Sequence, residues 1–209
     1  LHVRSRRQRQ MCIRDRLRSV TGKRLSDVRD ALFALKPAQV DERAAGYLVA
    51  LYTGSKQLDV RRQVLRLLYD CDFQALDEFF AQAYRKERYL DMKVYALRGL
   101  ARRSEEKQLQ RLLEGFRQTL AKRQQSTPYN YQEYELLRGR NALPYLVERY
   151  GYACLRETLE QVDRQYDAMP EAFKGHFTVD DDGEVVTLRE PGASSALIRQ
   201  FFACQGVQD

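Results

Sequence analysis

The sequence has no tryptophan, only two histidines and only five prolines among 209 residues. Its four cysteines form no C-x-x-C pair, so the usual clusters of His and Cys that bind zinc are missing. Scattered cysteines in a helical protein are typical of small core residues in a reducing compartment, although the alternative of disulfides stays open. The low proline and glycine content favours helices over a turn-rich β fold.

Motifs of catalysis are also missing. No G-x-G-x-x-G or G-x-x-x-x-G-K phosphate loop occurs, and Ser194 and Ser195 lack the second glycine of a nucleophile elbow. The acidic turn at 180–184 has its glycine at the fourth position, whereas a Ca²⁺-binding EF-hand needs glycine at the sixth. We therefore predict a non-enzymatic protein with no cofactor and no metal site.

No apolar run reaches the length of about 18 residues that a membrane helix needs, so we expect a cytoplasmic protein. The chain opens on Leu1 rather than Met. The first expected helix, from Ser26, also has no partner helix before it. We therefore expect an upstream segment to be missing, and a signal or membrane anchor in that segment is left open.

Positive charge is concentrated at the N-terminal end. The net charge is +7, and residues 1–16 hold six arginines against one aspartate. The segment 4–16 (RSRRQRQMCIRDR) resembles translated sequencing-adaptor DNA, as found at the ends of assembled metagenomic genes. We expect residues 1–16 to be a disordered or artefactual tail. The competing interpretation is a basic arm that binds nucleic acid or a nuclear-import receptor.

A short acidic motif recurs at a fixed interval. Asp27, Asp59 and Asp91 are spaced 32 residues apart, and each opens an apolar segment of helical period. A fixed period of about 20–50 residues indicates stacked structural repeats. No run of β-branched residues separates the segments, so antiparallel helix pairs of an α-solenoid are favoured.

Caps such as Asp59 and chain breakers such as Pro37 set the bounds of the expected helices. These bounds are 26–36, 41–53, 59–70, 72–88, 91–103, 104–124, 131–138, 141–151, 152–167 and 194–204. Two apolar stripes should face inward, namely Val60, Val64, Leu67 and Leu68, and then Leu76, Phe79, Phe80, Ala83 and Tyr84. Asp-Gly between β-forming segments predicts a β-hairpin over 177–188.

The second helix of each repeat carries a family resemblance. The segment from Asp59 reads D-x-R-x-x-V-L-R-x-L and matches the D-x-K-x-x-A-L-R-x-L that begins at Asp91. This pattern resembles the second helix of HEAT-like repeats, over about residues 26–124. The resemblance implies an all-α protein, with a short α-solenoid of HEAT-like helix pairs at 17–124. A helical C-terminal region at 125–209, bearing the hairpin, would then cap the core.

Charge is unevenly distributed along the chain. Residues 85–123 hold 12 Lys/Arg and 5 Asp/Glu, whereas residues 157–190 hold 10 Asp/Glu and 3 Lys/Arg. Equivalent positions of a solenoid stack along one face, so repeated cations can form a ladder that binds phosphates or an acidic peptide. The candidates for this partner-binding face are Arg61, Arg62, Arg66, Lys93, Arg98 and Arg102. The alternative is a solvated surface.

Tyrosine is abundant, with 13 residues in the chain. Three of them cluster at the loop expected at 125–130 and are further candidates for partner contact, namely Tyr129, Tyr131 and Tyr134. Tyrosine suits interfaces because its ring is apolar and its hydroxyl is polar. The alternative is packing between helices.

Taken together, these features predict a scaffold or adaptor that binds a protein or peptide on a solenoid face. The alternative is a nucleic-acid-binding HEAT-like protein related to the DNA-alkylation-repair glycosylases, a resemblance that implies a basic groove and a base site of aromatic residues with an Asp. A HEAT-like lyase acting on phycobilins or similar cofactors is a third interpretation, and no motif supports it.

Overall fold

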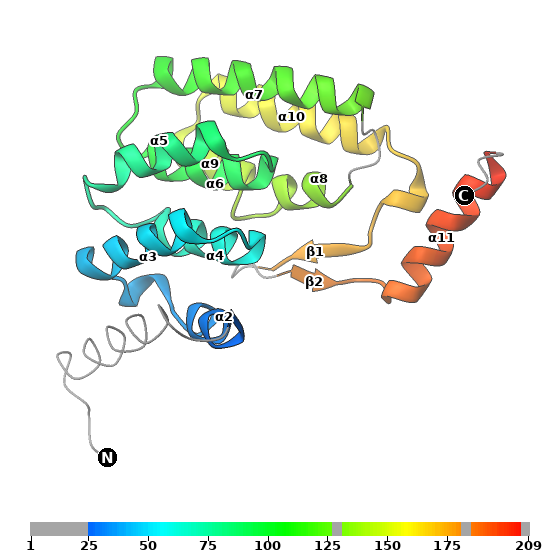
Figure 1. The fold of residues 1–209 in the computed structure, drawn as a ribbon. Helices are drawn as coiled ribbons and strands as arrows, with labels where there is room; N and C mark the ends of the chain where they lie inside the picture. The colour runs from blue at the N-terminus through cyan, green and yellow to red at the C-terminus, as the bar shows by residue number, and fades with distance from the viewer. Residues whose placement is uncertain (1–24, 127–130, 181–184, 206–209) are drawn as a thin grey trace. The chain divides into compact units, whose positions relative to one another are not determined.

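The structure is a computed structural model that describes residues 25–126, 131–180 and 185–205. Helices make up most of this part of the chain, and a small antiparallel pair of strands lies toward its end (Figure 1). The predicted all-α fold with a β-hairpin is thereby confirmed. In chain order the elements are α2 (Leu25–Phe33), η1 (Pro37–Gln39), α3 (Glu42–Gly54), α4 (Leu58–Leu68), α5 (Leu76–Lys86), α6 (Leu90–Ala101), α7 (Glu106–Ser126), α8 (Tyr131–Arg138), α9 (Leu143–Tyr150), α10 (Ala153–Asp167), η2 (Glu171–Phe173), β1 (Phe177–Val179), β2 (Val185–Thr187) and α11 (Pro191–Cys204).

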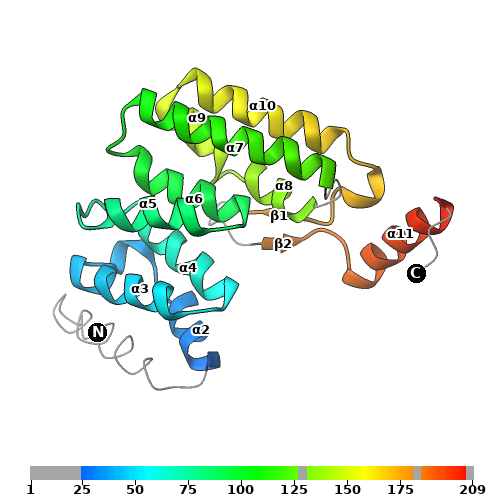
Figure 2. The ribbon, with the colours of Figure 1, turned by 45° about the horizontal axis from the view of Figure 1, so that its top comes forward.

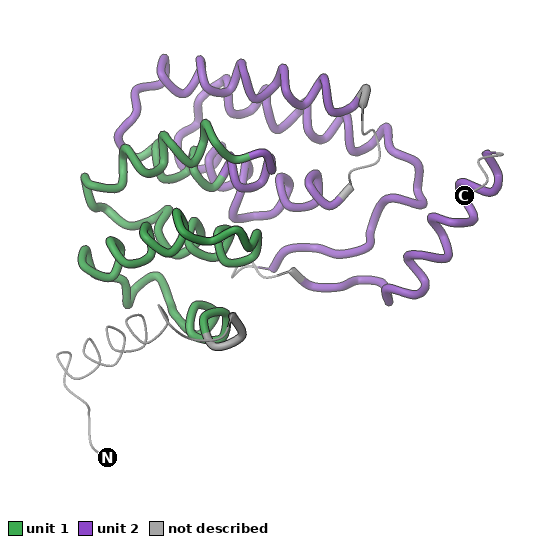
Figure 3. Tube along the Cα trace, viewed as in Figure 1, with its two compact units in different colours: residues 1–87, 95–102 green, residues 88–94, 103–209 purple. Residues whose placement is uncertain are grey.

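The chain forms two compact units (Figure 3). Unit 1 comprises residues 1–87 and 95–102, and unit 2 comprises residues 88–94 and 103–209. Helix α7 belongs to unit 2 and packs there against α10. The spacing of the sequence motif could not reveal that packing, since α10 lies beyond the segment that carries the motif.

Unit 1 is built from amphipathic helices. All four residues of the expected α4 stripe and all five of the α5 stripe are buried, as the periodicity predicts. Helix α4 packs against both α2 and α3. Most of the α4 surface is therefore covered, and burial of apolar side chains at about 25 cal/mol per Å² provides the main stabilisation.

The starts of α3 and α4 differ in their capping. Asp41 caps α3, because its carboxylate accepts the Ala44 N–H at 2.7 Å. The expected cap at Asp59 is wrong, since α4 already begins at Leu58 and Asp59 lies within its first turn. There the Asp59 carboxylate pairs with Arg29 of α2 at 2.7 Å, and its negative charge also suits the helix N-terminus.

The helices of unit 2 pack around α10. Helices α7 and α10 lie side by side in both views (Figures 1 and 2), and α8 and α9 also contact α10. The α9 helix begins at Leu143 rather than at 141, with Pro144 in its first turn. Gly151 ends α9 with a φ of 65°, a left-handed conformation that favours glycine.

The predicted hairpin forms, with Phe177 opposite Thr187 and Val179 opposite Val185. The Asp-Gly turn that predicted it lies outside the described residues. Strand β1 packs against α8. Gly139 allows this close approach, because a Cβ atom there would lie 3.1 Å from Cβ of Val179.

The last helix, α11, begins at Pro191, three residues before the predicted start at Ser194. Proline is well suited to the first helical position, because its fixed φ is already helical and its missing N–H is not needed there. Helix α11 packs on η2 through aromatic rings. The Phe173 ring centroid lies 5.2 Å from that of Phe201 and 6.0 Å from that of Phe202.

Candidate functional site

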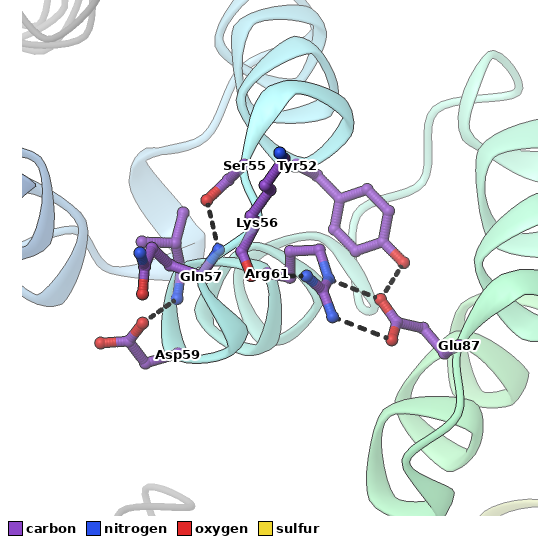
Figure 4. Close-up of polar contacts among 8 residues, drawn as sticks. Tyr52, Ser55, Lys56, Gln57, Asp59, Arg61 and Glu87 are labelled. Carbon is purple, nitrogen blue, oxygen red and sulfur yellow. Dashed lines mark hydrogen bonds and ion pairs between the residues drawn. The ribbon is translucent and has the colours of Figure 1, made fainter.

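The Arg61 side chain of α4 is held by Glu87, which follows α5 (Figure 4). Its Nε donates to Glu87 Oε1 at 2.9 Å, its Nη2 to Oε2 at 3.4 Å, and its Nη1 to the Lys56 carbonyl at 3.1 Å. Tyr52 of α3 donates its hydroxyl to the same Oε1 at 2.6 Å. Burial, and then this hydrogen bond, raises the pKa of Tyr52 above its ordinary value. The cluster therefore links helices within unit 1.

Arg98 of α6 is also bound within unit 1. Its Nε donates to Asp70 Oδ1 at 2.8 Å and its Nη2 to Oδ2 at 2.5 Å. The guanidinium carbon lies 3.9 Å from the centroid of the Tyr69 ring. A bidentate and stacked arginine of this kind fixes the geometry of its neighbours. Because Arg98 is only 6% exposed, it offers little surface to a partner.

The other predicted cations do not belong to a single unit. Arg62 and Arg66 are half-buried in unit 1, whereas Lys93 is half-buried in unit 2. Arg102 is exposed and pairs with Asp72 at 3.7 Å. The role of these cations in binding a partner stays a prediction.

The three predicted tyrosines have different positions. Tyr129 lies outside the described residues. Tyr131 is the first residue of α8, and its side chain is not among those described. Tyr134 is buried and donates its hydroxyl to Gln165 Oε1 at 2.7 Å. Tyr134 is therefore a core residue of unit 2, in agreement with the packing alternative for this one tyrosine.

A pocket of about 340 Å³ lies in unit 2, among residues of α8, α9, α10 and β1 and of the turn after α8. Its lining residues are Glu135, Arg138, Gly139, Arg140, Pro144, Leu159, Asp163, Thr178 and Val179. Ligand pockets commonly measure about 300–1,000 Å³. This pocket is therefore large enough for a small molecule or the end of a chain, but too small for a folded segment.

Arg138 of α8 has a fixed orientation at this pocket. Its Nε donates to Asp163 Oδ1 of α10 at 2.7 Å. Its guanidinium carbon lies 4.1 Å from the centroid of the Tyr166 ring. Within the described parts of the chain, Nη1 and Nη2 of Arg138 have no hydrogen-bond acceptor. Two contacts therefore orient the guanidinium and leave its outer edge available.

Glu135, another residue of the lining, is held by the hydroxyl of Tyr166. Its Oε1 accepts the Tyr166 hydroxyl at 2.6 Å and the Gly175 N–H at 3.3 Å. Burial, followed by the hydrogen bond to Glu135, raises the pKa of Tyr166 to about 12, so Tyr166 remains a neutral donor. Tyr166 thus supports both a carboxylate and a guanidinium of the pocket.

The lining of the pocket carries two carboxylates, two arginines and one threonine hydroxyl. Among the described residues that line the pocket there is no cysteine, histidine or serine that could act as a nucleophile or base. Both carboxylates of the lining, Glu135 and Asp163, already accept hydrogen bonds from the protein. In the described ranges no group of three or more His, Cys, Asp or Glu residues is arranged to hold a metal ion.

Sequence reasoning did not identify this pocket. Arg138 and Asp163 are 25 residues apart and Thr178 follows on another element, so no short motif joins them. The one local signal is a pair of arginines on either side of Gly139. That signal cannot show which acidic residue orients them, because the packing of α8 on α10 decides it.

Comparisons with protein-family models, with curated proteins and with solved structures gave no match to this chain. A membrane crossing is not seen either: none of the described helices combines the necessary length with the necessary apolar character.

Proposed function

We propose that the chain is a non-enzymatic module that binds a protein or peptide, and that the pocket of unit 2 is its binding site. The observation that carries this proposal is Arg138, a guanidinium oriented by Asp163 and Tyr166 with an available outer edge. Apolar residues and both signs of charge surround it. The lining is mostly polar, and precisely placed polar groups are what give a binding site its specificity.

Exposed apolar residues next to the pocket strand agree with a protein partner. Val186 of β2 is 40% exposed and Leu188, two residues later, is 59% exposed. Leu188 lies one residue beyond β2, but its N–H donates to the His176 carbonyl at 3.0 Å and so continues the pairing of the strands. Alternate residues of a paired strand point to the same side of a sheet. Exposed apolar groups that lie together indicate an interaction surface more often than isolated ones do.

We also propose that the repeated helices are HEAT-like. Asp59 and Asp91 are each the second residue of a helix, and they keep the 32-residue spacing of the motif. The short connections between α3 and α4 and between α5 and α6 are those expected of helix pairs. We further propose a cytoplasmic location, because the described cysteines, Cys71, Cys154 and Cys204, are free.

Nucleic-acid binding is the weaker alternative. It relied on a basic ladder, yet Arg61 and Arg98 direct their guanidinium groups to Glu87 and Asp70. An arginine that forms two hydrogen bonds to a carboxylate within its own fold must break them before it can bind phosphate.

The two functions can be separated by direct binding measurements on the full chain. Pools of short random peptides with free ends, labelled with fluorescein, would be titrated at low and moderate salt and followed by anisotropy. Single-stranded and duplex DNA would be titrated in parallel. We expect saturable peptide binding with a weak salt dependence, because a contact through one or two charges releases few counterions.

Binding of DNA alone, with an affinity that falls steeply as salt rises, would contradict the peptide-binding proposal and favour the nucleic-acid alternative. A deletion of residues 1–16 serves as the control for charge at the basic tail, because six arginines there could bind DNA non-specifically.

A further inference from the structure

We propose that the pocket of unit 2 binds the free C-terminal carboxylate of a peptide, and that the outer edge of Arg138 receives it. This inference rests on the peptide-binding function proposed above, and it specifies which part of the peptide is recognised. Four features support this inference: the orientation of Arg138, its Nη1 and Nη2 donors, the balance of charges in the lining, and the apolar residues of the lining.

Arg138 presents the donor geometry that a carboxylate needs. Its Nε is occupied by Asp163 Oδ1 at 2.7 Å, and its planar face lies against the Tyr166 ring. The described residues provide no acceptor for Nη1 and Nη2. These two nitrogens form the end-on edge of the guanidinium, which binds both oxygens of a carboxylate through parallel hydrogen bonds.

The Arg138 side chain is already oriented before a ligand binds, and this should raise its affinity for a carboxylate. Asp163 belongs to α10 and Arg138 to α8, and these helices pack against each other. Arg138 therefore loses less side-chain freedom on binding than a solvated arginine would, and this smaller entropic cost favours affinity. Asp163 acts here as a positioning residue, because it already contacts Nε and leaves the outer edge to the ligand.

The balance of charges in the lining favours a ligand that carries one negative charge over a ligand that carries many. Arg138 and Arg140 are opposed by Glu135 and Asp163, so the lining has two charges of each sign. A polyanion such as a nucleic-acid backbone would be repelled by the two carboxylates. A ligand with a single carboxylate adds only one negative charge to this balanced lining, whereas a polyanion adds several.

The apolar part of the lining suits the side chain of the last residue. Pro144, Leu159 and Val179 supply apolar surface next to the charged groups. A pocket of about 340 Å³ can hold the last one or two residues of a chain but not a longer segment. Burial of an aliphatic side chain is favourable by about 25 cal/mol per Å², so we expect a preference for peptides that end in Val or Leu.

The decisive comparison uses the unaltered full chain and changes only the ligand. Two fluorescein-labelled peptide pools, random except for a final Val or Leu, would carry either a free C-terminal carboxylate or a C-terminal amide. We expect the free-acid pool to bind at least about tenfold more tightly, because charge-assisted hydrogen bonds are lost with the amide. No protein variant is involved, so the comparison does not depend on whether a variant folds.

Variants of the pocket locate the site. Arg138→Gln should reduce the affinity for the free-acid pool by at least about tenfold and should remove the difference between acid and amide. Arg164→Gln is its matched control, since Arg164 of α10 is exposed and does not line the pocket. Thr178→Asp places a repelling charge at an exposed lining position and should also weaken acid binding. Its control is Thr187→Asp, at an exposed strand position outside the lining.

Each outcome distinguishes the two proposals. Equal binding of acid and amide pools, unchanged in Arg138→Gln, would overturn C-terminal recognition and leave peptide binding standing. Displacement of the peptide by free leucine at a similar affinity would identify an amino acid as the ligand and overturn the peptide C-terminus. Absence of binding by either pool to the unaltered chain would overturn both proposals. Acid-selective binding that is lost in Arg138→Gln and Thr178→Asp but kept in both controls is the expected result.

Discussion

Replacement of Arg61 by alanine should destabilise the fold far more than replacement of an ordinary surface arginine. Arg61 supplies two of the three hydrogen bonds that Glu87 accepts from side chains, and the Glu87 side chain is 6% exposed. The substitution would leave a buried carboxylate with only the Tyr52 hydroxyl as a donor. Breaking a buried ion pair in this way typically costs about 3–5 kcal/mol.

Partial exposure of Arg61 lowers the destabilisation expected for Arg61→Ala. Its side chain is 21% exposed, so water can reach the space that the guanidinium leaves and can solvate Glu87 in part. We therefore expect a loss of about 2–3 kcal/mol, below the range for a fully buried pair. For a chain of this size each kcal/mol lowers Tm by about 2–4 °C, so the melting temperature should fall by about 4–12 °C.

The assay is urea unfolding followed by far-UV circular dichroism, with calorimetry to detect separate transitions of the two units. Arg85→Ala is the matched control, because Arg85 is 65% exposed and its pair with Glu78 is exposed too. Such pairs contribute about 0–1 kcal/mol. Arg61→Ala should cost much less in a Glu87→Gln background, where no buried charge is left unpaired. A loss in Arg61→Ala no larger than in Arg85→Ala would refute the structural role of the pair.

Three further substitutions give contrasting expectations in the same unfolding assay. Gly99→Ala should destabilise by about 1–3 kcal/mol, because its Cβ would lie 2.4 Å from ring atoms of Phe80. Gly115→Ala should instead stabilise by about 0.5–1 kcal/mol, because no atom lies within 4 Å of the added Cβ in this helix. Burial raises the pKa of Glu133 in the folded chain above its ordinary value of 4.5. Between the pKa of the unfolded chain and that of the folded chain, the folded chain therefore binds more protons. The stability that Glu133 contributes is present below the unfolded-state pKa and is lost as pH rises through the folded-state pKa. Glu133→Gln should remove this fall and flatten the urea midpoint above about pH 4.5, whereas a parallel pH profile in the two proteins would contradict the assignment.

The parts of the fold that sequence predicted are those with a strong local signal. The stripes of α4 and α5 repeat with helical period, and every expected residue is buried. The helix expected at 41–53 forms as α3, and one short-range hydrogen bond makes Asp41 its cap. Asp59 looked the same in sequence, but its carboxylate pairs with Arg29 on another helix. A residue with both local and distant partners cannot be assigned from spacing alone.

The candidate site was beyond the reach of sequence for a related reason. Arg138, Asp163 and Thr178 come from three elements, and only the packing of α8 on α10 and on β1 brings them to one pocket. None of the three stands out as an isolated residue. Polar residues on short helices are common, and their chemistry becomes informative only when burial and hydrogen-bond partners are known.

The repeated arginines and the pocket arginine illustrate two different uses of the same side chain. Arg61 and Arg98 each lie in a copy of the sequence motif that begins at Asp59 and at Asp91, and each forms two hydrogen bonds to a carboxylate of its own unit. The charge of each is therefore neutralised within the fold. Arg138 occurs once, outside the period, and only its Nε is hydrogen-bonded among the described residues. Substitutions should therefore separate the two uses: Arg61→Ala should lower stability and spare peptide affinity in the folded protein, whereas Arg138→Gln should chiefly lower affinity. A folded Arg61→Ala protein that no longer binds peptide would place the binding face on the repeats instead.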